Sequence, residues 1–175
     1  MSDLQRIKQY ALSNTDIEKI LGKTKIFTYP ELDDFANWED AFDDDGRAVF
    51  LFLTEDNTTG HWIGLIRNDT TIEYFDPYGE PPEGDKKWLS KQKLRRLDQD
   101  QPLLTRFLRS TGMKVYYNQH AFQQDRNDIN TCGRWVVARL LLRKKTLRQF
   151  YNFIQNSGMK GDDFVSLLTF KILGK

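Results

Sequence analysis

Three short segments of the sequence carry side chains that could perform covalent chemistry. They are Gly60-His61-Trp62, Phe75-Asp76-Pro77-Tyr78-Gly79, and a longer segment that runs from Gln123-Gln124 to Thr131-Cys132-Gly133. Together they supply a thiol, an imidazole, a carboxylate and a carboxamide, which are the groups that a cysteine-dependent acyl transfer uses. Their order along the chain is histidine, aspartate, glutamine and cysteine.

The secondary structure expected around these segments would bring them together. The sequence predicts that His61 opens a strand, that Asp76 ends the next strand of the same hairpin, and that Cys132 begins a helix. In an antiparallel pair the start of one strand lies beside the end of the other, so we expect His61 and Asp76 to be neighbours. A helix start lowers the pKa of a cysteine, because the unpaired N–H groups and the helix dipole stabilise the thiolate.

Each of these side chains then has a chemical role. Cys132 would attack a carbonyl carbon, and His61 would pair with the thiolate and later protonate the leaving amine. Asp76 would hold the orientation and tautomer of the imidazole. The backbone N–H of Cys132 and a glutamine amide would stabilise the oxyanion. We expect Trp62 and Gly133, which flank the base and the nucleophile, to contact substrate, since a glycine allows close approach.

Every one of these residues also has an ordinary structural interpretation. A lone cysteine is often an inert core residue, and a histidine beside a tryptophan can be a half-buried core residue. Asp-Pro commonly opens a turn. The complete set in one order favours the catalytic interpretation. The second histidine, His120, precedes Cys132 in a polar loop, and we expect it at the surface or near the substrate, with the role of base as the alternative.

The hydrophobic pattern predicts four strands and several helices. Aromatic and β-branched residues separated by turn clusters predict strands at 47–54, 61–67 and 71–76, and a further strand at 113–117. Helical patterns cover a short helix with Thr15 and Glu18 as its capping box and Gly22 at its end, residues 88–110, a buried helix at 132–145, and two helices that begin after Thr146 and at Asp162. The last helix is expected to bury Phe164, Leu167, Leu168 and Ile172. We therefore expect one α+β domain over residues 1–175, with a small central, mostly antiparallel sheet flanked by helices.

Composition excludes several classes of protein. The chain has 175 residues with one cysteine and two histidines. One cysteine cannot form an intramolecular disulfide, and these residues cannot supply the four nitrogen or sulfur ligands of structural zinc. We expect no metal and no cofactor. Because no apolar run approaches about 18 residues and the amino terminus has early charges, we expect neither a membrane span nor a signal peptide, and an intracellular protein that is not secreted.

Charge is uneven although the formal net charge is only +1. Residues 31–45 are acidic, whereas residues 86–96 and 134–148 are basic. Such runs are usually solvated faces. The two basic segments would also allow a weak contact with DNA, and nothing in the sequence requires that contact.

The order of these residues, with the motifs GHW, FDPYG and TCGRWVVARL, resembles the adenain-like and ubiquitin-like-protein protease superfamily of cysteine peptidases. The similarity runs from about Asn14 to the carboxyl terminus. It is greatest to the maturation proteases of adenoviruses, virophages and Polinton-type elements. The resemblance implies the adenain-like fold and an endopeptidase that cleaves capsid or other virion precursors, often after a small residue such as glycine. It also implies a protein of the host cytoplasm or nucleus, in the virus factory, that can be packaged in the virion.

The resemblance assigns the catalytic roles to His61, Asp76 and Cys132. Family members place the oxyanion glutamine somewhat closer to the cysteine than it lies here. We select Gln123, with Gln124 as the alternative, and expect a monomer that acts on polypeptides. Two other functions stay open: a protease for ubiquitin-like modifiers, and a non-catalytic module that binds nucleic acid or peptide on the same scaffold.

Overall fold

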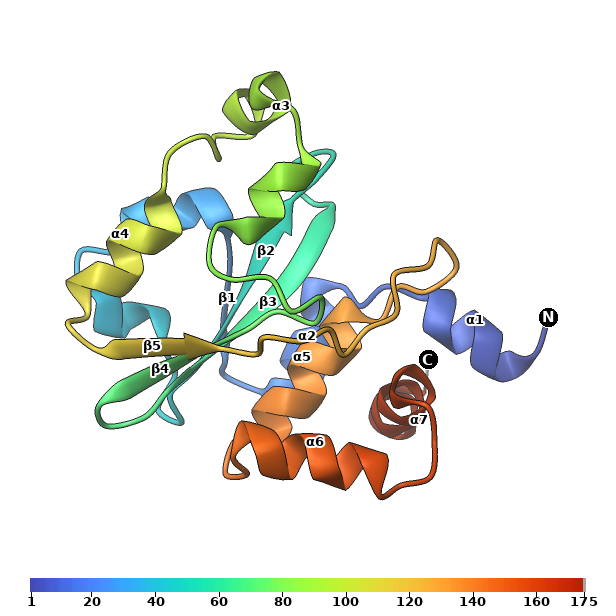
Figure 1. Ribbon diagram of the computed structural model, residues 1–175. Helices are drawn as coiled ribbons and strands as arrows, with labels where there is room; N and C mark the ends of the chain where they lie inside the picture. Colours follow the sequence, from blue (N-terminus) through green and yellow to red (C-terminus); the bar gives the residue numbers. More distant parts are fainter. Residues whose placement is uncertain (175) are drawn as a thin grey trace.

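A five-stranded sheet with the order β1-β2-β3-β4-β5 forms the centre of the computed structural model, which describes residues 1–174 (Figure 1). The strands are β1 (Lys25–Thr28), β2 (Arg47–Leu53), β3 (Gly60–Arg67), β4 (Thr71–Phe75) and β5 (Lys114–Tyr117). The central pairs β2–β3 and β3–β4 are antiparallel, as predicted. The edge pairs β1–β2 and β4–β5 are parallel, so the sheet is mixed and the antiparallel description does not extend to its edges.

Helices cover both faces of this sheet. The α-helices are α1 (Asp3–Gln9), α2 (Asn14–Leu21), α3 (Lys91–Arg96), α4 (Leu103–Ser110), α5 (Cys132–Leu141), α6 (Leu147–Gln155) and α7 (Gly161–Leu173), and the short 3₁₀ helices are η1 (Tyr29–Asp34), η2 (Trp38–Ala41) and η3 (Gly84–Trp88). Figure 1 shows α5, α6 and α7 together on one side and α4 on the other. The α+β class is confirmed. No described helix has the length and apolar character needed to cross a membrane.

Strand β2 shows why the sheet needs cover on both faces. All seven of its residues are buried, because its side chains alternate between two apolar clusters. Val49, Leu51 and Leu53 join the cluster that includes α5. The side chains between them, such as Phe50, join the cluster beneath η1 and α4. The candidate site lies where β2 ends, β3 begins and α5 begins.

Several predicted elements end or cap differently in the structure. The cap of α2 is Ser13 with Asp16, each side chain bonding the backbone of the other, rather than Thr15 with Glu18. Residues 88–110 are not one helix, because Asp98 takes a positive φ of 55° and Pro102 cannot donate a backbone hydrogen bond. Strand β1 was not predicted.

The apolar face predicted for α7 is confirmed only in part: Phe164 and Leu168 pack against the core, whereas Ile172 is half exposed. Three of the four buried residues, Asp162, Ser166 and Thr169, are polar, and the fourth is Val165. The reason lies in α5, which buries donors that need acceptors. Nη1 of Arg134 donates to the Thr169 hydroxyl at 2.5 Å, and Nε1 of Trp135 donates to Oδ1 of Asp162 at 2.8 Å.

Candidate active site

His61 and Asp76 are brought together by the antiparallel pairing of β3 with β4. Gly64 pairs with Phe75, so the beginning of β3 lies beside the end of β4. Nε2 of His61 is 2.6 Å from Oδ1 of Asp76, and both residues are buried. The prediction that these two side chains are neighbours is confirmed. Because Nε2 is occupied by the carboxylate, Nδ1 is the ring nitrogen left to face another partner.

Asp76 is held from the other side by Asn118, the residue that follows β5. The Asp76 backbone N–H donates to Oδ1 of Asn118 at 3.0 Å, and Nδ2 of Asn118 donates to the Asp76 carbonyl at 2.5 Å. The backbone N–H of Tyr78 also donates to Oδ1 of Asp76 at 2.8 Å. Asn118 is fully buried and was missed in the sequence. Its only signal there is a polar residue directly after a strand.

Cys132 is the first residue of α5 and is half-buried. Burial alone would raise the pKa of its thiol, but hydrogen bonding to His61 and the positive charge of that imidazole outweigh burial and lower the pKa. The backbone N–H groups of Trp62 and Gly133 act in the same direction. The structure thus brings His61, Asp76 and Cys132 into one connected set.

The pKa of His61 changes for complementary reasons. Burial favours the neutral imidazole, yet the negative charge of Asp76 and its hydrogen bond raise the pKa of His61 well above its ordinary value. The interaction with Cys132 raises it further. Both shifts favour a thiolate paired with an imidazolium, which is the reactive state of a cysteine nucleophile.

Trp62 and Gly133 pack against each other beside this set. A side chain at Gly133 would meet Cδ1 of Trp62 at 2.9 Å and Cβ of Leu12 at 3.1 Å. Nε1 of Trp62 donates to the Leu12 carbonyl at 2.9 Å. Both residues are buried, so the contacts described here are structural, and substrate contact by Trp62 and Gly133 stays a prediction.

The structure distinguishes the two candidate glutamines. Gln123 is 4% exposed, and its Nε2 donates to the Tyr78 hydroxyl at 3.2 Å and to the Ile129 carbonyl at 3.5 Å. Its backbone N–H donates to the Pro77 carbonyl at 3.0 Å, which ties this loop to the Asp76 segment. Gln124 is exposed, and its backbone N–H donates to Asp162. Gln123 is therefore the glutamine that faces the site, through Tyr78.

Two aromatic rings cover His61, and neither was assigned from the sequence. The ring of Tyr78 lies 4.7 Å from that of His61 between centroids, and the ring of Trp88 lies at 6.2 Å. Burial raises the pKa of Tyr78 to about 12, as does the negative charge of Cys132, which keeps its hydroxyl protonated. Trp88 is 46% exposed. Its ring meets the imidazole edge-on.

A second buried acid, Asp85, lies next to the His61–Asp76 pair and was also missed. The ligand atoms of His61, Asp76 and Asp85 all lie within 4.8 Å of one another, which is close enough to consider a metal ion. A metal between His61 and Asp76 would have to replace their 2.6 Å hydrogen bond. The site's other features, a half-buried thiol and a buried carboxamide, are those of acyl transfer.

The second histidine and the basic segments have other surroundings. His120 is exposed and packs against Phe122 and Tyr151, at ring distances of 4.6 and 5.4 Å. Arg134 and Arg139 are buried, so the part of the basic segment 134–148 that they form cannot contact DNA. Most bases of 86–96 are exposed, and contact with DNA there stays a prediction.

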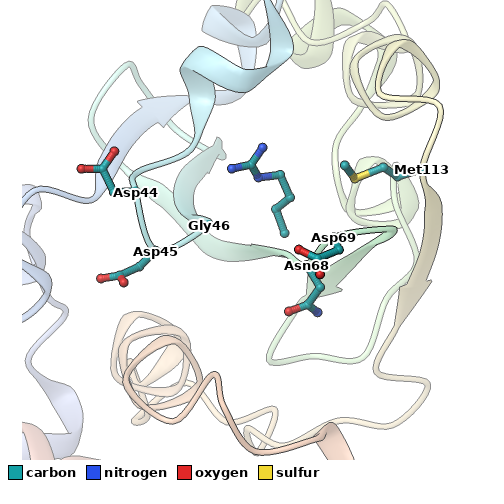
Figure 2. A pocket seen from close by; sticks show the side chains of 7 residues that line it. Asp44, Asp45, Gly46, Asn68, Asp69 and Met113 are labelled. Atoms are coloured by element: carbon teal, nitrogen blue, oxygen red, sulfur yellow. The ribbon is translucent and has the colours of Figure 1, made fainter.

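Two hollows flank the sheet, and they lie at opposite ends of β3. A groove of about 600 Å³ is lined by residues 11–15, β1, the loop 57–60 and Trp62, which follows His61 in the sequence; His61 and Cys132 themselves do not line it. The hollow of about 530 Å³ in Figure 2 is lined by Asp44, Asp45, Gly46, Arg67, Asn68, Asp69 and Met113. Arg67 ends the strand that His61 opens, so the hollow in Figure 2 is remote from Cys132.

Comparisons with known proteins give one relative across the whole chain. No protein-family model matches the sequence. The chain is 34% identical to the "Uncharacterized protein V9" of Sputnik virophage over 175 residues, which cover 97% of this chain and 99% of that protein. Among solved structures, the central domain of the uncharacterized Lpg1148 protein from Legionella pneumophila is similar over 94% of this chain and 99% of its own, with 14% identity and a TM-score of 0.45. The chain therefore belongs to the same protein family as V9 of Sputnik virophage.

Proposed function

We propose that this virophage-related protein is a cysteine endopeptidase with Cys132 as its nucleophile. The observation that carries the proposal is the connected series of buried Asp76, buried His61 and half-buried Cys132, in which the pKa of the thiol is lowered and that of the imidazole is raised. The adenain-like assignment of the fold is part of the same proposal.

In the proposed reaction Cys132 is the nucleophile, His61 transfers protons and Asp76 orients His61. The Cys132 thiolate attacks the carbonyl carbon of the scissile peptide bond, and the His61 imidazolium gives its proton to the leaving amine. The amine product departs and leaves a thioester. His61, now neutral, takes a proton from water, which attacks the thioester and releases the carboxylic acid. Asp76 holds the imidazole throughout and stabilises its charged form.

The oxyanion of each tetrahedral intermediate needs donors that are already in place. The first N–H groups of α5 have no acceptor within the helix, so the backbone of Cys132 supplies one donor. We assign the second to Nε2 of Gln123, which in the resting state donates to the Tyr78 hydroxyl. For this role the amide of Gln123 would exchange its contact with Tyr78 for one with the oxyanion.

An extended polypeptide is the substrate class that the surroundings favour. The groove beside Trp62 has room for several residues, and its wall includes the edge strand β1. The relationship to a virophage protein directs the choice of substrate to virion precursors. If the protein instead cleaved a folded ubiquitin-like modifier efficiently, the substrate class would change, but the proposed reaction at Cys132 would stay the same.

The proposal is tested by incubating candidate capsid precursors of the same virus with the wild-type protein and with Cys132→Ala. The wild type should cut at defined positions, found by sequencing the new amino termini, and the variant should not. Equal cutting by both proteins would exclude Cys132 as the nucleophile. Salt-dependent binding to nucleic acid without cleavage would favour the non-catalytic module.

A further inference from the structure

Asp85 is a buried carboxyl group that the proposed reaction does not use. It is 2% exposed and lies in η3, next to the fully buried Asp76. The ligand atoms of Asp85, Asp76 and His61 all lie within 4.8 Å of one another. Two carboxyl groups so close in the interior of a protein do not both ionise, because like charges repel and water does not solvate them.

Three buried oxygens of this acid pair lack a hydrogen-bond donor among the described residues. They are Oδ2 of Asp76 and both carboxyl oxygens of Asp85. The other oxygen of Asp76, Oδ1, accepts from His61 and from the backbone N–H of Tyr78. A proton shared between the two carboxyl groups supplies the missing donor, since the O–H of one acid then donates a hydrogen bond to an oxygen of the other.

The surroundings of each acid place that proton on Asp85. Asp76 faces the imidazole, which stabilises its negative charge. The lysines that follow Asp85 point to other acids: Lys86 binds Glu83 at 2.8 Å, and Lys87 binds Glu80 at 2.5 Å.

We propose that Asp85 is a positioning residue whose protonated carboxyl group donates a hydrogen bond to Oδ2 of Asp76 and so keeps Oδ1 directed at His61. Its consequence for catalysis rests on the proposed function. Burial raises the pKa of Asp85 to about 8; the positive charge of His61 opposes this shift, and the charge and hydrogen bond of Asp76 support it. Among the described residues, the titratable groups that face Asp85 include His61, Asp76 and Glu80, and those that share a small cavity with it are Tyr29, Tyr74 and Glu83.

The backbone that carries Asp85 is fixed by the residue at the start of η3. Glu83 has a positive φ of 72°, which is strained for a residue with a side chain. Its Oε1 accepts a hydrogen bond from the Tyr29 hydroxyl at 2.6 Å, and Lys86 binds its other oxygen. The turn before η3 is closed by the Gly84 N–H, which donates to the Pro81 carbonyl at 2.8 Å. These hydrogen bonds fix the backbone that places Asp85 next to Asp76.

The shared proton is tested without any substrate by measuring stability against pH. In the unfolded chain the pKa of Asp85 is about 3.9, whereas in the folded protein it is about 8. Between these values the folded state binds the extra proton, so wild-type stability falls as pH rises. Asp85→Asn keeps a donor and does not ionise. Its stability relative to wild type, from urea unfolding, should therefore increase with pH across this window.

Asp85→Ala also removes the ionisation and serves as a second variant if Asn distorts the site. Its difference from wild type should follow the same pH dependence, with a constant offset. A difference that does not change between pH 4 and pH 8 in either variant would overturn the proposal. Stoichiometric Zn²⁺ binding that Asp85→Asn abolishes would overturn it too, because a metal would then replace the proton.

The catalytic consequence is tested by kcat on a cleaved precursor. Asp85→Asn should retain most of the wild-type kcat, since its amide still donates to Oδ2 of Asp76. Asp85→Ala should lower kcat by about 10- to 100-fold with little change in KM, because the imidazole loses its fixed orientation. Equal losses in both variants would overturn the positioning role. Failure of the proposed protease activity would appear as no cleavage by the wild type, with the stability result unaffected.

Discussion

Oδ1 of Asp76 lies 2.6 Å from Nε2 of His61 in a place where both residues are buried. This contact determines which ring nitrogen is free for Cys132, and it determines the charge of the imidazole. Burial opposes both shifts, but Asp76 and, to a lesser extent, Cys132 raise the pKa of His61, and His61 lowers the pKa of Cys132. The thiolate–imidazolium pair is the state from which the predictions below follow.

Replacing His61 should return the Cys132 thiol to ordinary reactivity. In His61→Ala the hydrogen bond and positive charge that lower the thiol pKa are lost, and burial alone raises it. The rate of alkylation by iodoacetamide should then rise at a higher pH than in wild type. The matched control is His120→Ala, which removes the exposed second histidine and should leave the pH profile unchanged. A profile shifted by His120→Ala instead would make His120 the base.

Replacing Asp76 by asparagine should weaken turnover and narrow the pH range of activity. The carboxylate is the main group that raises the pKa of His61, so its loss lowers that pKa. The imidazolium is then lost at lower pH, and the alkaline limb of the kcat profile should move toward acid. We expect kcat to fall by about 10²-fold or more, the typical contribution of positioned acid–base catalysis. An unchanged alkaline limb would mean that Asp76 does not set the charge of His61.

Gln123→Ala should remove one oxyanion donor. Loss of such a donor typically costs about 2.7–4 kcal/mol in the transition state, which is about 10²- to 10³-fold in kcat, with KM nearly constant. Gln124→Ala is the matched control, because this neighbour is exposed and only its backbone N–H bonds to the protein. The opposite ranking of the two variants would assign the donor to Gln124.

The ion pair between Glu73 and Arg139 should matter for stability. Nε and Nη2 of Arg139 donate to the two carboxylate oxygens of Glu73 at 2.7 and 2.8 Å, and both side chains are buried. Glu73→Ala leaves the guanidinium unpaired, so we expect the free energy of unfolding to fall by about 3–5 kcal/mol. Arg6→Ala breaks an exposed pair with Asp3, and it should cost less than about 1 kcal/mol. Urea unfolding of the two variants measures both values. Similar losses of unfolding free energy in the two variants would show that burial of the ion pair does not determine how much its removal destabilises the protein.

The elements that were predicted well are those whose pattern is local. The runs at 47–54, 61–67, 71–76 and 113–117 form β2 to β5 within one residue, because aromatic and β-branched residues between turn clusters leave few alternatives. Strand β1 has only four residues and is held by parallel pairing to β2, a long-range contact with no local signal. The face of α7 was predicted only in part, because Arg134 and Trp135 on α5 bind polar partners there that an apolar pattern does not indicate.

The candidate site divides in the same way. His61, Asp76 and Cys132 could be chosen because their residue types are rare and the hairpin explains the proximity of two of them. Asn118 and Asp85 reach the site from the end of β5 and from η3, and only the tertiary structure brings those segments to Asp76. Tyr78 lies two residues after Asp76, but its ring contact with His61 has no signal in the sequence. The resemblance to virophage proteins is confirmed at the level of the family by V9, and the peptidase activity is the proposal.

The measurement that tests the central claim most directly can be made before any natural substrate is identified. A proteome-derived peptide library is incubated with the wild-type protein and, in parallel, with Cys132→Ala, and the new amino termini are identified by mass spectrometry. We predict cleavage by the wild type at a restricted set of sequences and none by Cys132→Ala, whose fold is checked by circular dichroism. No new termini with wild type, or the same termini with the variant, would contradict the claim that Cys132 cleaves peptide bonds.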